Sequence, residues 1–458
     1  MRIIICGAGQ VGYSIASYLA REDADVTVID KNPDIIAQVN DGLDVNGIVG
    51  HASKPDTLSQ AGAADADIIL AVTHSDEVNM VACQVAHSLF NVPKKIARVR
   101  EQSYLEPAWS NLFSRAHMPI DVIISPEKEV AKGIFQRLSI PGTSNVVSLA
   151  DDKIKLVGVV CDEKCPVTYT QFKQIHSLFP GLHMEIGAII RGAETIIPDK
   201  NDQIIEGDEV YFFTDNDHLQ RAMTAFGHQE RKARHITIMG GGNIGLFLTE
   251  MLQKDYKNVQ LKILEHSEER AIFLSEHLSD VIVINGDALQ NDIMKEANIA
   301  QTETLIAITN DDETNIIGSL MAKNMGCERA MTLINKTDYS PLIMPLGIDA
   351  TISPRIITVS SIMRHVRRGR IKELHNVCNG SAEVMQIEVA DNAAVANKII
   401  ADIKWPKNVA LGAVMRNDEL ISMHKEQTIK PGDHVILLMK SGMSRKVEKL
   451  FMPEMNLF

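Results

Sequence analysis

An internal repeat constrains this chain more than any other feature, because nearly every signal in its first half returns about 235 residues later. The opening stretch "IIICGAGQVG" corresponds to "ITIMGGGNIG" near the middle, and "VTVIDKNPD" corresponds to "LKILEHSEE". The alignment continues as far as "PIDVIISPE" and "GIDATISPR". A colinear repeat of this length predicts two copies of one architecture.

Each copy has the pattern of a doubly wound α/β lobe. Short β-branched runs alternate with segments of helical period, which is typical of a parallel sheet with helices on both faces. In the first copy these runs are residues 3–6, 26–29, 68–72, 96–99 and 121–124. A helical stretch follows each Ser-Pro, and alternating strands with a Gly-Asp turn then predict a small α+β cap. The expected fold is α/β, with two tandem doubly wound Rossmann lobes, each followed by a cap lobe.

The length of 458 residues exceeds what one ordinary hydrophobic core needs, so several domains are expected. The hydrophilic stretch "GHQERKAR" separates the two halves and is the best candidate for a linker. The predicted divisions are residues 1–124 for the first Rossmann lobe, 125–227 for a crossover helix and the first cap, 228–234 for the linker, 235–352 for the second Rossmann lobe, and 353–458 for a crossover helix and the second cap.

Composition excludes several classes of protein. The longest apolar runs are strand-length, well short of the roughly 18 residues that span a bilayer, and the N-terminal run lacks a signal peptide's cleavage region. We therefore expect a cytoplasmic protein. A net charge of -13 opposes a nucleic-acid partner. The six cysteines have neither disulfide-framework density nor paired metal-ligand spacing, so no metal site is predicted.

The two glycine turns have the spacing of a dinucleotide-binding turn. The first glycine permits a tight turn, the second admits a pyrophosphate close to the backbone, and the third lets helix and strand pack closely. The following helix offers unpaired N–H groups to the phosphates. The predicted contacts are Gly7, Ala8, Gly9, Gln10, Val11 and Gly12 in the first half, and Gly240, Gly241, Gly242, Asn243, Ile244 and Gly245 in the second.

An acidic residue ends the next strand of each copy, Asp30 in the first and Glu265 in the second. Each lies about 20 residues beyond its turn, where a carboxylate can accept hydrogen bonds from adenosine ribose hydroxyls and repel a 2′-phosphate. The pattern favours NAD(H) over NADP(H). An acidic helix cap after the second strand is the alternative interpretation.

Further candidates follow the third and fourth strands, whose carboxyl ends face the ligand in such folds. Small residues there would admit an adenine, and the threonines could bond a ribose or a phosphate, although ordinary turn chemistry explains them as well. These candidates are Ala52, Thr73 and His74 in the first half, and Asp287, Ala288 and Thr309 in the second.

One asymmetry stands out in the repeat: Arg98 ends the fifth strand of the first lobe, where the second lobe has Leu333. A guanidinium there can fork onto phosphate oxygens. We therefore expect the first half to hold phosphate-rich nucleotides about tenfold or more tighter. The alternative is that Arg98 points into a subunit interface or into solvent.

The glycine turns with their acids, the "T-x-x-D-E-x-N" signatures ending at Asn79 and Asn315, and the "G-D-x-V" cap strands resemble the regulators of potassium conductance, also called potassium-transport nucleotide-binding domains. The resemblance covers nearly the full length. It implies a peripheral cytoplasmic subunit on the inner face of the cell membrane. Such a subunit forms a homo-oligomeric ring, expected as a tetramer, beneath a membrane-embedded potassium transporter subunit and responds to NAD(H) and to ATP or ADP.

Two other functions were weighed against this regulator. An NAD-dependent oxidoreductase needs an acid or base beside the nicotinamide. By type His51 and His74 qualify, but Asp287 and Asn310 stand at the aligned positions, so no such group is kept in both halves. We expect no catalytic residue and no enzyme. A passive assembly module with degenerate nucleotide sites is the third interpretation.

Overall fold

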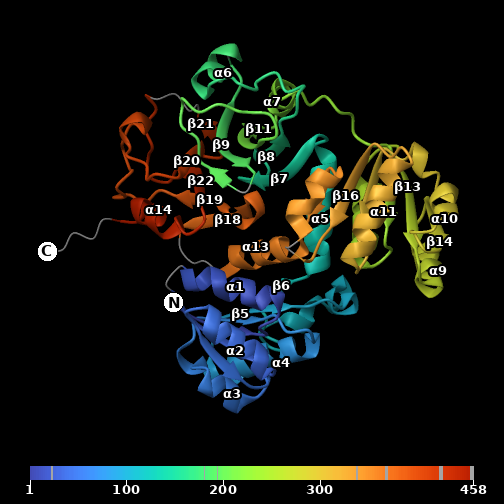
Figure 1. The fold of residues 1–458 in the computed structure, drawn as a ribbon. Coiled ribbons are helices and arrows are strands. Elements are labelled where there is room, and N and C mark those ends of the chain that lie inside the picture. The colour runs from blue at the N-terminus through green and yellow to red at the C-terminus, as the bar shows by residue number, and fades with distance from the viewer. Residues whose placement is uncertain are drawn as a thin grey trace. The chain divides into compact units, whose positions relative to one another are not determined.

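The computed structural model describes residues 1–21, 24–179, 181–192, 194–336, 339–366, 370–421 and 426–453. By packing, the chain divides into two compact units (Figure 1). One unit contains residues 1–129 with 355–369, and the other contains residues 130–354 with 370–458. In the described part of the chain, no helix combines the length and the apolar character needed to cross a membrane.

The first lobe begins each strand–helix unit with a buried apolar strand, as the β-branched runs predict. Its elements are β1 (Arg2–Cys6), α1 (Gln10–Arg21), β2 (Asp25–Asp30), α2 (Pro33–Gly42), β3 (Asn46–Val49), α3 (Pro55–Gln60), β4 (Ile68–Ala71), α4 (Asp76–Phe90), β5 (Lys94–Arg98) and β6 (Val122–Ile124). The six strands pair in parallel in the order β3-β2-β1-β4-β5-β6. This is the Rossmann order, with its switch point between β1 and β4.

The second lobe repeats that order. Its elements are β12 (His235–Met239), α8 (Asn243–Asp255), β13 (Gln260–Glu265), α9 (Glu268–His277), β14 (Val281–Asn285), α10 (Asn291–Glu296), β15 (Thr304–Ala307), α11 (Asp312–Asn324), β16 (Arg329–Leu333), α12 (Ser340–Ile343) and β17 (Ala350–Ile352). The parallel sheet runs β14-β13-β12-β15-β16-β17. The predicted pair of Rossmann lobes is confirmed.

The two crossover helices are exchanged between the lobes. Helix α13 (Pro354–Val366) follows the second lobe in sequence, yet its apolar face completes the core of the first lobe next to α1 (Figure 1). Its buried side chains in that core are Val359, Ile362, Met363 and Val366. The expected boundary at residue 353 grouped this helix with the second cap, whereas packing groups it with the first lobe.

Helix α5 (Pro126–Ser139) is the counterpart that follows the first lobe. Its Phe135 ring meets the Tyr256 ring of the second lobe edge to face, with centroids 5.9 Å apart, and the Tyr256 hydroxyl donates to the Leu138 carbonyl. Sequence pattern predicts that such a helix has one apolar face, but it does not say which sheet that face will cover.

Each cap lobe is a five-stranded antiparallel sheet with the same strand path. The first cap contains β7 (Thr143–Leu149), β8 (Ile154–Val160), α6 (Phe172–Leu178), β9 (Met184–Arg191), β10 (Glu194–Ile196), β11 (Glu209–Asp215) and α7 (Leu219–Ala225). The second contains β18 (Ile371–Val377), β19 (Ala382–Glu388), β20 (Val409–Arg416), β21 (Glu419–Ile421), β22 (His434–Lys440) and α14 (Ser444–Phe451). Their orders are β10-β9-β11-β8-β7 and β21-β20-β22-β19-β18.

The two cap sheets share one hydrophobic core. Leu156 and Phe213 of the first cap lie in the same buried cluster as Val384 and Leu438 of the second. Close approach depends on Gly412, because a Cβ there would lie 2.5 Å from the Phe213 ring. The caps therefore form one packed body rather than two independent modules.

The Gly-Asp turn of each cap holds a buried aspartate that is paired with a partly exposed arginine. Asp208 and Asp433 are each 1 % exposed, and each accepts two hydrogen bonds from an arginine on a neighbouring strand. Arg191 binds Asp208 at 2.9 and 2.8 Å, and Arg416 binds Asp433 at 2.7 and 2.8 Å. A buried carboxylate needs such pairing, so the aspartate of "G-D-x-V" stabilises the fold.

Candidate functional site

The first glycine turn joins β1 to α1 and gives each glycine a separate role. Gly7 has φ +104°, in the left-handed region that favours glycine. A Cβ at Gly12 would lie 1.8 Å from the Gly7 carbonyl oxygen, so no side chain fits between helix and turn. At Gly9 an added Cβ would meet nothing within 4 Å. The turn is therefore open where a pyrophosphate would approach.

The second turn, between β12 and α8, repeats this geometry. Gly240 has φ +108°, and a Cβ at Gly245 would lie 2.4 Å from its carbonyl oxygen. The space at Gly242 is again open to 4 Å. Both turns have the shape that a dinucleotide requires, and nucleotide binding by them stays a prediction.

The acidic residue at the end of the second strand closes each turn. One carboxylate oxygen of Asp30 accepts the Ala8 N–H at 2.7 Å, and one of Glu265 accepts the Gly241 N–H at 2.8 Å. A carboxylate has about four lone-pair sites, so each acid keeps acceptor capacity for ribose hydroxyls.

The helix caps that follow these strands are provided by other residues. The Asn32 side chain accepts from the Asp34 N–H, and the Ser267 hydroxyl accepts from the Arg270 N–H. Asp30 and Glu265 are therefore not the N-caps of α2 and α9, although the second carboxylate oxygen of each accepts the N–H of the capping residue, Asn32 at 2.9 Å and Ser267 at 2.8 Å.

The "T-x-x-D-E-x-N" signature forms a clamp at the same edge of each sheet. The hydroxyl of Thr73 donates to the Asn79 side chain at 2.7 Å, and Thr309 donates to Asn315 at 2.7 Å. Each asparagine also donates to the last carbonyl group of the next strand, at 2.9 Å in β5 and 3.1 Å in β16. Because the hydroxyl hydrogen is committed, the threonine oxygen can accept from a ribose but has no hydrogen left for a phosphate.

Arg98 lies beside the first turn with its guanidinium buried. Its Nη2 donates to the Thr73 carbonyl at 2.8 Å, and the Thr73 backbone is 3.0 Å from the place a Gly7 Cβ would take. Its Nε is buried without a hydrogen-bond partner. Burial, with the nearby charge of Arg100, lowers the Arg98 pKa. With 7 % of its surface exposed, Arg98 does not extend into solvent, and the alternative that it faces a subunit interface stays open.

The second turn has its own arginine, which the sequence analysis missed. Half-buried Arg270 of α9 donates from Nε to the Gly241 carbonyl at 2.8 Å and from Nη2 to the Asn243 side chain at 3.3 Å, and it lies over the Phe273 ring. In the repeat it aligns with Ile35. A comparison of charge at every aligned position would have found it.

The remaining predicted contacts lie after the third and fourth strands, as expected. Ala52 and Ala288 are buried, and His74 is exposed. The Asp287 side chain accepts the Leu289 N–H at 2.9 Å, which is ordinary turn chemistry.

The fold and the turns together define a class of protein with tandem Rossmann lobes, each carrying an open dinucleotide-type turn and paired with an antiparallel cap. The TrkA-N domain matches residues 3–126 and 236–354, and the TrkA-C domain matches residues 384–452. The chain belongs to the TrkA family.

Relatives that match over the full length support this assignment to the TrkA family. The Trk system potassium uptake protein TrkA of Azorhizobium caulinodans is 43% identical over 458 residues, covering 100% of both chains. That of Halomonas elongata is 39% identical, also over 100% of both. TrkA homolog 2 of Methanosarcina mazei is 31% identical over 98% of this chain and 100% of its own.

Solved structures show the same fold. The GsuK RCK domain superposes with a TM-score of 0.59 at 18% identity, covering 98% of this chain and 94% of that one. The GsuK channel bound to NAD has a TM-score of 0.59 at 18% identity, with coverage of 98% and 78%. At these identities the likeness concerns the fold alone.

Proposed function

We propose that this chain is a nucleotide-sensing regulatory subunit that gates a membrane-embedded potassium uptake transporter from the cytoplasmic face. It acts through a ligand-driven conformational change in a homo-oligomeric ring, as a tetramer. The observation that carries the proposal is the pair of glycine turns with the same open geometry in one chain. Its relatives are named as Trk system potassium uptake proteins, which supports the choice of partner.

The residues fit NAD(H), and ATP or ADP, at either turn. Backbone N–H groups at the start of α1 and α8 face the pyrophosphate, while Asp30 and Glu265 accept from the ribose and repel a 2′-phosphate. Arg98 adds a charge-assisted hydrogen bond in the first lobe, and Arg270 adds one in the second. The bound nucleotide supplies negative charge, and these residues orient it.

Ligand binding changes conformation only when one state binds the ligand better. Arg270 now donates to the neutral carbonyl of Gly241 and the neutral amide of Asn243. Phosphate oxygens are stronger acceptors for a guanidinium, so Arg270 would exchange these neutral acceptors for a phosphate when a nucleotide is bound. That exchange would be the local difference between the two states.

We propose binding without turnover. In the first lobe His51 is engaged with Ser53 at 2.8 Å and His74 is exposed, while the aligned positions of the second lobe are Asp287 and Asn310. An oxidoreductase would need an acid or base held against the nicotinamide, and neither histidine has a counterpart that keeps that role in the second lobe.

Potassium flux through a reconstituted transporter tests the proposal. Flux is measured with and without the chain, under NADH, NAD, ATP and ADP, and with Gly9→Val/Gly242→Val as the matched variant. The intact chain should make flux depend on nucleotide, and the double variant should abolish that dependence. Flux that never responds to any of the four nucleotides would refute the regulatory role.

A further inference from the structure

The first cap lobe contains a cluster of two imidazoles and one carboxylate, independent of the glycine turns. His183 directly precedes β9, Asp215 is the last residue of β11, and His218 directly precedes α7. Across the described ranges, these are the three side chains of metal-ligating type whose ligand atoms all lie within 4.8 Å of one another.

Asp215 lies between the two rings. Its Oδ2 is 3.0 Å from Nδ1 of His183, and its Oδ1 is 2.7 Å from Nδ1 of His218. The ring centroids are 4.4 Å apart. The His218 N–H donates to the same carboxylate at 2.8 Å, and the Thr214 hydroxyl donates to the His183 carbonyl at 2.8 Å, so backbone contacts fix all three positions.

The converging atoms are two ring nitrogens and the oxygens of one carboxylate, which hydrogen-bond one another in this structure and are also ligand types that Zn²⁺ accepts. Zn²⁺ bonds of about 2.0–2.2 Å place tetrahedral ligands about 3.4 Å apart, so each histidine nitrogen, now 3.0 or 2.7 Å from the Asp215 carboxylate, needs to move away from it by only about half an ångström.

We propose that His183, Asp215 and His218 bind a divalent transition-metal ion of the Zn²⁺ class. Imidazole with a single carboxylate suits Zn²⁺, whereas Mg²⁺ and Ca²⁺ take oxygen ligands almost exclusively. Three protein ligands leave a fourth position for water or another group. His183 is half exposed and Asp215 is 17 % exposed, so an ion can enter from the His183 side.

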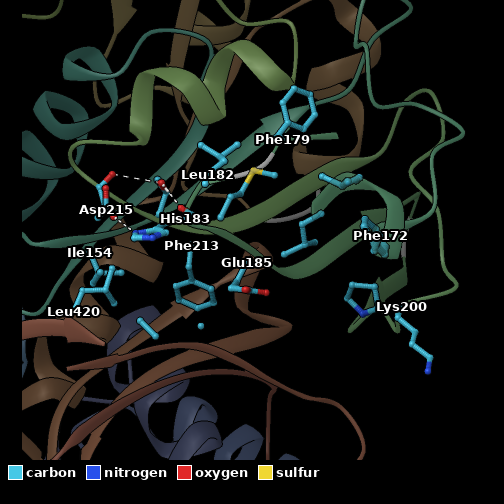
Figure 2. Close-up of a pocket in the computed structure, with 18 of the residues that line it drawn as sticks. Ile154, Phe172, Phe179, Leu182, His183, Glu185, Lys200, Phe213, Asp215 and Leu420 are labelled. Carbon is cyan, nitrogen blue, oxygen red and sulfur yellow. Dashed lines mark hydrogen bonds and ion pairs between the residues drawn. The ribbon is translucent and has the colours of Figure 1, made fainter. Parts of the chain in front are cut away.

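Two of the three ligands, His183 and Asp215, line a cavity of about 1070 Å³ that is shared by the two caps. Figure 2 shows His183 and Asp215 together on one side of it, with Phe172 and Lys200 on the other. Leu420 of the second cap completes the wall beside them. An ion bound there would stiffen the first cap where it meets the second, as an input separate from nucleotide.

The second cap provides an internal control. At the aligned positions it has Asn408, Lys440 and Met443, and the same backbone register is present because the Lys440 N–H donates to the Asn408 carbonyl at 3.1 Å. A lysine ammonium in place of the carboxylate repels a cation. The proposed site therefore belongs to the first cap alone.

Metal binding to the full chain tests this. Chelator-treated protein is titrated with Zn²⁺ by calorimetry and with Co²⁺ by visible absorption. The main variant, His183→Asn/His218→Met, installs residues that the second cap already tolerates at these positions. The matched control is His375→Asn, which breaks a His–Glu pair at 3.0 Å that belongs to no three-ligand cluster within the described residues. Asp215→Asn, which keeps the side chain's shape, is the second variant.

One Zn²⁺ per chain should bind to the parent and to His375→Asn. Both site variants should bind at least about a hundredfold more weakly, since loss of an outer partner alone costs about 10–100-fold. The Co²⁺ spectrum should lack a thiolate charge-transfer band. Unchanged Zn²⁺ affinity in both site variants, a thiolate band, or equal competition by Mg²⁺ would each overturn the assignment.

Discussion

The two glycine turns agree in backbone and differ in the cation beside them. In the first lobe the cation is Arg98 at the end of β5, and the aligned residue of the second lobe is Leu333. In the second lobe it is Arg270 on α9, and the aligned residue of the first is Ile35. Each lobe thus has one arginine at its turn, presented from a different element.

This difference separates the features of the turn that both repeats keep from the position of the arginine, which differs between them. Both lobes keep three features that the backbone of the turn requires. The first glycine has a positive φ, the second glycine has free space beside it, and an acidic side chain accepts an N–H group of the turn. The backbone of the turn does not fix which element carries the neighbouring arginine. Two sites of equal shape can therefore prefer different nucleotides, and with Arg270 beside the second turn we expect an asymmetry smaller than the tenfold one predicted from Arg98 alone.

The largest effect should come from adding a methyl group at the third glycine of each turn, where helix and turn are in closest contact. Gly12→Ala places a methyl group 1.8 Å from a backbone oxygen, and Gly245→Ala places one 2.4 Å away, so both lobes must shift. We expect about 3 kcal/mol or more of destabilisation in the first case and less in the second. Hydrogen exchange of the full chain, which separates the lobes, measures this. Equal protection in both variants would contradict the difference in packing.

The next effect concerns binding at the open glycine. Gly9→Val and Gly242→Val each fill one pyrophosphate position and leave the fold intact, since a Cβ there meets no neighbour within 4 Å. Affinity at the altered turn should fall at least about a hundredfold, equal to about 2.7 kcal/mol. Calorimetry should report two NADH sites in the parent and one in each variant. A variant that keeps both sites would exclude that turn.

A smaller effect should come from the arginines. In a Gly242→Val chain, where only the first turn can bind, Arg98→Leu should weaken ATP about tenfold, and in a Gly9→Val chain Arg270→Leu should do the same, since about 1.4 kcal/mol is one decade. The crossed combinations, with the arginine in the blocked lobe, are the controls. The full chain is needed because cutting at the linker would part each lobe from the crossover helix that packs on it. An Arg98→Leu change without effect would remove Arg98 from the site.

The smallest expected effect is a difference between the two caps in how stability depends on pH. Glu209 of the first cap aligns with His434 of the second, and burial raises the pKa of Glu209 while it lowers the pKa of His434. The folded state then resists ionising either group, so Glu209 destabilises it as pH rises above the ordinary carboxyl range, and His434 does so as pH falls below about 6.5. Glu209→Gln should remove the fall in melting temperature that begins as pH rises above about 4.5, and His434→Gln should remove the fall that begins as pH drops below about 6.5. Parallel profiles for both variants and the parent would contradict these shifts.

Much of the fold is predictable from the sequence because it depends on short-range patterns. The β-branched runs locate five of the six strands of the first lobe within about two residues, and the repeat transfers them to the second. Asp30 and Glu265 were found for the same reason, since strand end and turn are covalently close.

The rest depends on contacts that no local pattern encodes. Helix α13 has one apolar face, and nothing in its own residues selects the first lobe over the second. Arg270 acts across the turn from the next helix, and His183 meets Asp215 only because β9 and β11 are paired. Spacing along the chain therefore gave no sign of the metal-type cluster.

The exchange of crossover helices also has a consequence for biosynthesis. The last strand of the first lobe ends at Ile124, but the helix that completes its core spans Pro354–Val366. At about 5–20 residues per second, a ribosome takes roughly 10–50 s to cover that interval. The apolar face of the first lobe therefore stays exposed until α13 has been synthesised. We expect nascent chains that stop before residue 354 to be bound by holding chaperones.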